Sequence, residues 1–293
     1  MKNFSFILAA TFLVSTANFS IPKKRLIEYS YNIYSQFGED GIIRKIFAII
    51  GTQSKLAVEF GAWDGFHLSN TAALWAKDPS WKAVLIEGDA DRFKDLIKST
   101  QLYSNVTPIN AWVGIGKNDC LEAILKQKNV RESIDLLSID IDGNDYHIFE
   151  SLKEIRPRLI ICEYNPTIPV TYDVYAPYSS DNNFGQSVAA LNRVAASKGY
   201  TLVALTPVNA FYVRNSDFAK FSEFETDLHL LNVNDGYMTV VTTYDGKYVL
   251  LKNKHPNYFY GVDEQFHGKL LGDYIRCDTK PLPLAPVAGS YKK

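Results

Sequence analysis

The chain has 293 residues, of which 46% are hydrophobic and 22% are charged, and its formal net charge is −1. This is the composition of an ordinary globular protein, and it excludes global disorder. Because the chain has no excess of basic residues, we expect no nucleic-acid partner. The three cysteines, Cys120, Cys162 and Cys277, are too few and too widely spaced for a disulfide framework or a zinc site.

The N-terminus contains an apolar run, Phe4–Val14, which follows Lys2 and precedes small residues at positions 15–17. This pattern is typical of a secretory signal, and the run is shorter than the roughly 20 residues that a membrane-spanning helix needs. A membrane anchor is the alternative, and the basic cluster at 23–25 would then keep the downstream part cytoplasmic. We therefore treat residues 1–22 as a signal-like or anchor-like segment.

From residue 29 onward, apolar strands alternate with amphipathic helices. In chain order, the patterns predict a helix at 40–50, a strand at 56–60, a helix at 69–76, a strand at 83–86, a helix at 91–99, a strand at 106–113, a helix at 121–127, a strand at 134–139, a helix at 146–155, a strand at 159–162, a helix at 186–198 and strands at 200–205 and 210–214. Strands that are apolar throughout indicate a mostly parallel sheet with helices on both faces. The sequence thus predicts an α/β, Rossmann-like domain over residues 29–217.

After Asp217 this alternation fades. Two apolar runs, at 238–244 and 247–251, flank Asp245-Gly246, which is a strong signal for a β-hairpin. We therefore expect residues 218–293 to form a C-terminal extension that contains a hairpin, not a second full domain.

The segment Glu59–Gly65 follows the first predicted strand and carries two glycines. Gly61 permits a tight turn, and Gly65 allows the backbone to approach a ligand closely. Glu87 ends the next strand, where an acid can bind ribose hydroxyls; the alternative is a structural turn with a solvated Glu87. Because the carboxylate of Glu59 would repel a pyrophosphate, the loop favours S-adenosylmethionine (SAM), which carries an amine and a sulfonium, over a dinucleotide.

A second group of acids, Asp140, Asp142 and Glu163, follows two later strands. Ligands of α/β folds bind at this carboxyl edge of the sheet. Three interpretations stay open. The group could bind a divalent cation through oxygen, one carboxylate could accept a hydroxyl proton from a substrate, or the acids could only form turns, with Asp142 or Asn144 capping the following helix.

Four segments together resemble the FkbM-type family of SAM-dependent methyltransferases. They are Ser35–Gly41, Glu59–Gly65, Ile86–Asp89 and Leu137–Asp145, and the resemblance covers roughly residues 33–215 in order. It implies a class I methyltransferase sheet with a closing antiparallel strand, and methylation of a hydroxyl oxygen on a sugar or small natural product.

The resemblance also implies a role for each site residue. The cofactor-binding residues would be Gln36 and Asp40 near the amino-acid end of SAM, Glu59, Gly61 and Gly65 at its methionine side, Glu87 at the ribose and Asp89 near the adenine. Asp140, Asp142 and Glu163 would line the acceptor side as catalytic residues or metal ligands. We expect Gly61→Arg to abolish SAM binding without unfolding the protein.

The expected partner is a small-molecule or glycan acceptor, with membrane association through the N-terminal segment as an option. A SAM-dependent enzyme would be cytoplasmic or membrane-associated, whereas cleavage of residues 1–22 as a signal would make the protein secreted. Two alternative functions follow from the same features. One is a non-catalytic exported binding protein on this fold, and the other is a metal-dependent glycosyl or nucleotide-sugar enzyme that uses Asp140-Ile141-Asp142 as its metal site.

Overall fold

The structure is a computed structural model that describes residues 22–181, 183–232, 238–242 and 248–252. The predicted signal-like or anchor-like segment lies outside these residues, apart from Pro22. In the described part of the chain, no helix is both long enough and apolar enough to span a membrane.

Helices and strands alternate along the domain, as the sequence predicts. The strands of the main sheet are β1 (Leu56–Phe60), β2 (Lys82–Glu87), β3 (Val106–Asn110), β4 (Leu136–Ile139), β5 (Leu159–Glu163), β6 (Tyr200–Leu205) and β7 (Asn209–Arg214). The helices between them are α1 (Glu39–Ile50), α2 (Ala72–Trp75), α3 (Ala90–Thr100), α4 (Leu121–Gln127), α5 (Asp145–Ser151) and α6 (Val188–Ser197). Helix α2 is shorter than predicted because residues 69–71 bind a buried carboxylate before the helix begins.

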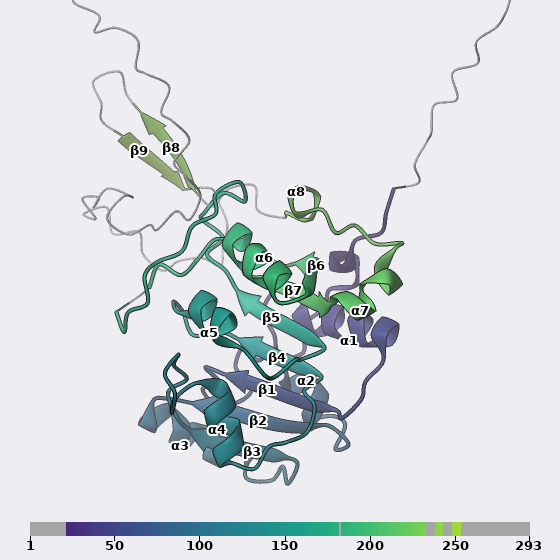
Figure 1. Ribbon diagram of the computed structural model, residues 1–293, viewed down its shortest axis with the longest axis vertical. Helices are drawn as coiled ribbons and strands as arrows, with labels where there is room; N and C mark the ends of the chain where they lie inside the picture. The colour runs from purple at the N-terminus through teal and green to yellow at the C-terminus, as the bar shows by residue number, and fades with distance from the viewer. Residues whose placement is uncertain (1–21, 182, 233–237, 243–247, 253–293) are drawn as a thin grey trace, which may run out of the picture.

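The seven strands form one sheet in the order β3-β2-β1-β4-β5-β7-β6 (Figure 1). Strands β1 to β5 run parallel, and β7 is antiparallel to both β5 and β6. The prediction of a mostly parallel Rossmann-like sheet with a closing antiparallel strand is therefore confirmed. The strand order reverses between β1 and β4, and such a reversal is where open α/β sheets bind their ligands.

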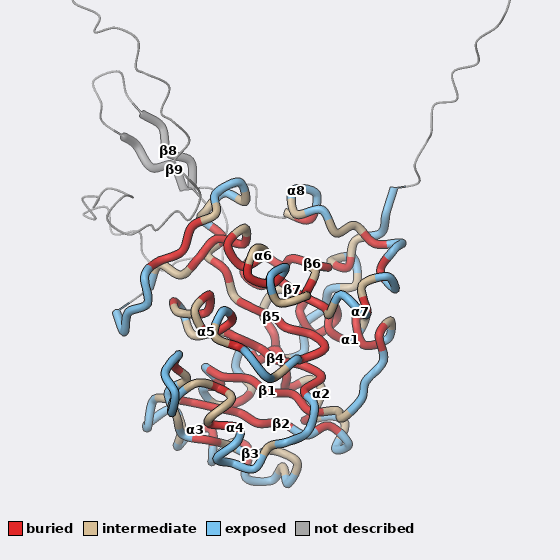
Figure 2. Tube along the Cα trace, viewed as in Figure 1, coloured by how far each residue is buried: buried red, intermediate tan, exposed pale blue. Residues whose placement is uncertain are grey.

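Helices cover both faces of the sheet and give two hydrophobic cores. The strands between the helices are largely buried (Figure 2). Helices α4, α5 and α6 pack on one face, against Val58, Phe60 and their neighbours on adjacent strands. Helices α1, α2 and α3 pack on the other face, against residues such as Ala57 and Leu85. Because successive strand residues point to opposite faces, both faces need apolar side chains, and this explains the continuous apolar runs in the sequence.

The described residues after β7 continue the domain. Helix α7 (Asn215–Phe218) spans the boundary that we expected after Asp217, and it leads into η2 (Ala219–Phe221) and α8 (Leu228–Leu231). Phe221 and Phe224 are buried, and the backbone of Lys24 exchanges hydrogen bonds with Glu223 and Glu225, just beyond η1 (Leu26–Tyr29) on the N-terminal side. Farther on, β8 (Met238–Thr242) and β9 (Tyr248–Lys252) pair antiparallel, as the predicted hairpin requires; residues 243–247 between them lie outside the described part.

A buried ion network lies at the amino edge of the sheet, away from the ends where ligands bind. The Arg158 guanidinium is 3.7 Å from Asp135 and 3.3 Å from Asp217, and it also donates to the Gly51 carbonyl. All three ionised side chains are nearly inaccessible to solvent, with exposed fractions of 7%, 0% and 11%. The network therefore joins the starts of β4 and β5 to the end of α1 and to α7.

Removing the arginine should strongly destabilise the protein. We expect Arg158→Met to lower the free energy of unfolding by about 3 kcal/mol, because it removes the buried positive charge between two carboxylates. Asp135 then keeps only its backbone amide donors, and Asp217 keeps only Lys220. Urea denaturation measures this loss. The matched control is Lys82→Met, which breaks the exposed Lys82–Glu132 pair and should cost less than about 1 kcal/mol. Equal losses in the two variants would contradict the structural role of Arg158.

Candidate functional site

One row of residues, mostly polar, crosses the carboxyl edge of the sheet. Glu87 lies opposite Asn110, and Glu163 lies opposite Asn209. On the strands between them, Phe60 pairs with both Ile86 and Ile139, and Ile139 pairs with Cys162. The next residue of each strand therefore lies in the same row: Gly61 after Phe60, Glu87 after Ile86, Asp140 after Ile139 and Glu163 after Cys162. In spatial order it reads Asn110, Glu87, Gly61, Asp140, Glu163 and Asn209. The pattern thus places a glycine, flanked by acids, at the point where the strand order reverses.

The row belongs to the face of the sheet that α1, α2 and α3 cover. Phe60, Ile86, Ile139 and Cys162 belong to the opposite core, and side chains alternate along a strand, so the next residue of each strand faces the other way. Glu59 is on this face too, because it precedes Gly61 by two residues, and it pairs with Ser138. Five of the predicted site residues, Glu59, Gly61, Glu87, Asp140 and Glu163, therefore share one face at one edge.

Gly61 makes the closest approach between the loops after β1 and β4. Its φ is +75°, and a Cβ atom built there would lie 1.9 Å from the carbonyl oxygen of Asp140. Any side chain at this position therefore requires the Asp140 backbone to move. This geometry contradicts our expectation that Gly61→Arg leaves the fold intact. Gly65 has a φ of +82°, and its missing Cβ makes room for Leu85 and Leu96, so both glycines accommodate other parts of the chain.

The carboxylate of Glu59 is buried and holds the segment before α2. Its Oε2 accepts hydrogen bonds of 2.6 Å from the hydroxyls of Ser69 and Thr71, and its Oε1 accepts one of 2.8 Å from the Asn70 amide. Burial raises the pKa of Glu59, and these three donors oppose that shift. The side chain that we assigned to the cofactor therefore also fixes the path of the chain beyond the glycine loop.

Glu87 connects the loop after β1 to the loop after β2. Its Oε2 accepts a hydrogen bond from the Trp63 amide and its Oε1 accepts one from the Asp89 amide, both at 2.8 Å. Trp63 has a φ of +44°, which is unusual for a bulky residue, and the Arg92 guanidinium lies 4.8 Å from its ring centroid. Each oxygen of Glu87 can accept a second hydrogen bond. Asp89 is exposed and caps α3 through the amides of Asp91 and Arg92.

The segment before α1 folds around two buried acids. One of them, Asp40, accepts hydrogen bonds at Oδ2 from the amides of Ile33, Tyr34 and Ser35 and from the Ser35 hydroxyl. Its Oδ1 is buried and has no hydrogen-bond partner in the described part of the chain. Gln36 lies half-buried in the same turn.

The side chain of the second acid, Glu39, contacts the turn between β6 and β7. Its Oε2 accepts from the Phe37 amide at 2.7 Å, and its Oε1 accepts from the Thr206 hydroxyl at 2.8 Å and the Asn209 side-chain amide at 3.3 Å. Sequence reasoning missed Thr206 and Asn209, and it did not foresee that Glu39 contacts them. Their contacts join residues 167 and 170 positions apart, and no local pattern indicates such a pairing.

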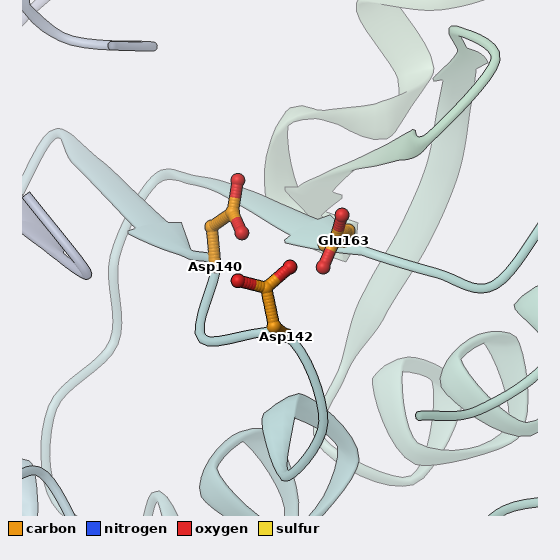
Figure 3. Close-up of side chains that lie close together, drawn as sticks. All are labelled: Asp140, Asp142 and Glu163. Carbon is orange, nitrogen blue, oxygen red and sulfur yellow. The ribbon is translucent and has the colours of Figure 1, made fainter. Parts of the chain in front are cut away.

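The three acids beyond β4 and β5 converge (Figure 3). Carboxylate oxygens of Asp140, Asp142 and Glu163 lie within 4.8 Å of one another. Asp140 and Glu163 are half-buried and Asp142 is exposed. The turn that brings Asp142 back has a φ of +56° at that residue, and Asp145 closes it by accepting hydrogen bonds from the amides of Ile141 and Gly143.

Crowding of like charges changes the acidity of this group. Burial, followed by the nearby charges of Asp145 and Asp142, holds the pKa of Asp140 well above its usual range. Burial and Asp140 do the same to the pKa of Glu163, and burial raises the pKa of Asp145 to about 6. The cluster therefore disfavours full ionisation of all its members at once.

The capping interpretation of these acids finds no support in the hydrogen bonds. Helix α5 begins at Asp145 with Asn144 at its N-cap, and the Asn144 side chain makes no capping bond. Its amide instead donates to the carbonyl of Ser179 at 2.8 Å, and so it secures the long loop after β5.

The carboxyl groups at this edge form no ion pair within the described part of the chain. Among the residues that the structure describes, no Lys, Arg or His lies within 4.0 Å of a carboxylate oxygen in this set. The set consists of Glu39, Asp40, Glu59, Glu87, Asp140, Asp142, Asp145 and Glu163. A sheet edge rich in carboxyl groups and without a basic partner in the described residues favours a cationic ligand over an anionic one. A separate groove of ≈ 520 Å³, lined by residues that include Trp63, His67 and Lys98, contains none of these acids.

A comparison with protein families matches part of the chain. The model of the methyltransferase FkbM domain matches residues 117–202, a range that contains β4, β5 and the three converging acids. Residues 117–202 are thus similar to a methyltransferase FkbM domain. The resemblance noted in the sequence is confirmed over this range, and the match supports a SAM-dependent methyltransferase without identifying the acceptor. SAM is the cofactor that this family implies.

Several solved structures of methyltransferases are similar to the chain. The N-terminal domain of EvdMO1 with SAH bound has 14% identity, a TM-score of 0.38, and coverage of 60% of this chain and 79% of that chain. The precorrin-6y C5,15-methyltransferase from Geobacter metallireducens GS-15 has 11% identity, a TM-score of 0.38, and coverage of 62% and 90%. A putative O-methyltransferase from Klebsiella pneumoniae has 17% identity, a TM-score of 0.37, and coverage of 66% and 92%. A comparison with curated proteins gives no match.

Proposed function

We propose that this protein transfers the methyl group of SAM to a hydroxyl oxygen of a small-molecule or glycan acceptor. The observation that carries the proposal is the row at the carboxyl edge, in which Gly61 separates Glu87 on one side from Asp140 and Glu163 on the other. We assign the Glu87 side to the cofactor and the Asp140 side to the acceptor.

The described residues fit SAM in two respects. The carboxyl groups of this edge have no basic partner in the described residues, and they suit a ligand that carries a sulfonium and an amine and has no phosphate. Gly61 leaves the centre of the row without a side chain. In this proposal Glu87 binds the ribose through its remaining lone pairs, with Asp89 near the adenine. Gln36 and the unpaired Oδ1 of Asp40 lie toward the amino-acid end of SAM.

Within this scheme, Glu59, Gly61 and Gly65 act on the methionine side by fixing the loop. Glu59 ties that loop to residues 69–71, and the two glycines let it pack closely against β2, α3 and the Asp140 backbone. The same residues thus set the distance between the cofactor side and the acceptor side, which matters because transfer requires in-line alignment of two reactants.

Transfer to oxygen breaks the S–CH3 bond, forms an O–CH3 bond and releases the hydroxyl proton. When bound, SAM supplies the electrophilic methyl group. The carboxylates of Asp140, Asp142 and Glu163 are the groups on the acceptor side that can orient the hydroxyl and accept its proton.

Isothermal calorimetry with SAM tests the cofactor assignment, and methyl-labelled SAM with a panel of hydroxylated sugars and natural products tests the reaction. We expect SAM binding, and a product whose methyl group NMR assigns to oxygen. No binding at millimolar SAM to folded protein would overturn the proposal. A product methylated on nitrogen or carbon would overturn its O-directed part alone.

Neutralising Glu87 should weaken cofactor binding. We expect Glu87→Gln to raise the SAM dissociation constant about tenfold, because a hydrogen bond to a charged group is lost and the new amide faces a backbone N–H. Calorimetry measures the change. Asp91→Asn, an exposed acid on α3 that pairs with Lys94, is the matched control and should bind SAM as the wild type does. If Glu87→Gln also binds normally, the ribose assignment is wrong.

A further inference from the structure

We propose that the separate groove beside α3 binds one neutral sugar ring of the pyranose type. The loop after β1 and the helix α3 with its C-cap form the two walls of this groove. The residues that the argument uses are Trp63, Asp64 and His67 from the loop, and Asp95, Lys98 and Gln101 from the helix and its C-cap. Binding of the sugar does not rest on the proposed methyl transfer, because no residue assigned to the cofactor or the acceptor lines the groove.

The groove has the size of a small-molecule site. Its volume is ≈ 520 Å³, and proteins bind small ligands in clefts of about 300–1,000 Å³. The Ser99 hydroxyl on α3 donates a hydrogen bond to the Asp64 carbonyl on the loop, and Gly65 lets Leu96 of α3 pack against the same loop. These contacts fix the two walls relative to each other, so the groove does not depend on a ligand for its shape.

Trp63 supplies an aromatic surface in a fixed orientation. Its φ of +44° is strained for a bulky residue, and such strained residues cluster at ligand-binding sites. Its amide donates to Glu87 at 2.8 Å, and the centroid of its ring lies 5.0 Å from that of His67 and 4.8 Å from the Arg92 guanidinium. Trp63 nevertheless keeps an exposed fraction of 39%. An indole held in this way offers a surface on which the C–H groups of a sugar ring can pack.

The polar side chains of the groove have unused hydrogen-bonding capacity. Asp95, Lys98 and Gln101 are exposed, and their side chains make no hydrogen bond or ion pair within the described residues. Asp64 accepts hydrogen bonds at Oδ1 from the amides of Phe66 and His67, which leaves its Oδ2 for a ligand. Carboxylates accept hydrogen bonds, an ammonium donates them and an amide does both, as the hydroxyl groups of a sugar require.

The charge of the groove favours a neutral ligand. The ammonium of Lys98 stands against the carboxylates of Asp64 and Asp95, so neither a phosphate nor a polycation finds a matching field. A purely apolar ligand would contact the indole, but it would also remove water from these charged groups without replacing their hydrogen bonds. A pyranose has an apolar face of C–H groups and a rim of hydroxyls, and so it matches both parts of the groove.

Saturation-transfer NMR and calorimetry on the full chain test the groove with the methyl glycosides of glucose, galactose and mannose as probes. We expect at least one glycoside to bind with a dissociation constant of about 1 mM, and its C–H protons on one ring face to receive the strongest saturation. Trp63→Ala should raise this constant at least about tenfold, and Asp95→Asn and Gln101→Ala about threefold each. Asp95 and Gln101 are exposed, so their variants should fold, which circular dichroism checks.

Trp112→Ala is the control for Trp63→Ala. Trp112 has an exposed fraction of 74% and does not line the groove, so the variant should bind the glycoside as the wild type does. Failure of all three glycosides to bind the wild type, or equal binding by wild type and Trp63→Ala, would overturn the sugar site. An apolar fluorescent dye that binds at Trp63 when no glycoside does would also overturn it and assign the groove to an apolar ligand.

Calorimetry with SAM keeps this outcome separate from that of the proposed function. SAM binding without glycoside binding refutes the sugar site alone. Glycoside binding that depends on Trp63, in a chain that does not bind SAM, supports the sugar site and refutes the methyl-transfer proposal.

Discussion

Gly61→Ala is expected to raise the SAM dissociation constant at least about 100-fold and to lower the free energy of unfolding by about 4 kcal/mol. A residue with a side chain at a φ of +75° costs about 1–2 kcal/mol. The remainder comes from the added methyl group, which would lie 1.9 Å from the Asp140 carbonyl oxygen. Relief of that contact moves the Asp140 backbone, and with it the spacing between the cofactor and acceptor sides.

Gly199→Ala is the matched control for this prediction. Gly199 has nearly the same φ, +77°, but its missing Cβ has no atom within 4 Å. The control therefore contains the backbone strain without the clash, and it should cost about 1 kcal/mol and leave SAM binding unchanged. Urea denaturation and calorimetry measure both quantities. If the two alanine variants are equally stable and bind SAM equally, the close approach of the β1 and β4 loops is wrong.

The sequence predicts the sheet well because burial on both faces imposes a simple pattern. The predicted strands at 56–60 and 200–205 agree with β1 and β6 at both ends, and the predicted helix at 121–127 agrees with α4. The strand predicted at 106–113 ends at Asn110, where Glu87 and Asn110 terminate the pairing of β2 with β3. Strand ends are harder to predict than strand interiors because loop contacts with distant residues set them.

The candidate site was only partly predictable for the same reason. Acids that directly follow strands, such as Asp140 and Glu163, can be placed at one edge by the rule for parallel sheets. The link from Glu39 to Asn209 has no such rule, since it depends on how the start of α1 packs against the β6–β7 turn. A residue that positions others is therefore easily taken for one that binds a ligand.

Variants of Glu59 can distinguish a residue that positions others from one that binds the ligand. We expect Glu59→Leu to lower the free energy of unfolding by about 5 kcal/mol, because the donors of Ser69, Asn70 and Thr71 lose their common acceptor, and an unpaired buried donor costs about 1–3 kcal/mol. Glu59→Gln keeps the volume and one oxygen acceptor, so it should cost about 2 kcal/mol. Urea denaturation ranks the two variants.

Hydrogen exchange at the Asn70 amide separates a positioning role of Glu59 from direct contact with SAM. If Glu59 acts by holding residues 69–71, Glu59→Gln accelerates exchange at Asn70 and weakens SAM binding by no more than about tenfold. Loss of SAM binding with the Asn70 amide still protected would contradict the positioning role and assign the carboxylate to the cofactor. We expect the first result, because both oxygens of Glu59 already accept hydrogen bonds from the segment that leads into α2.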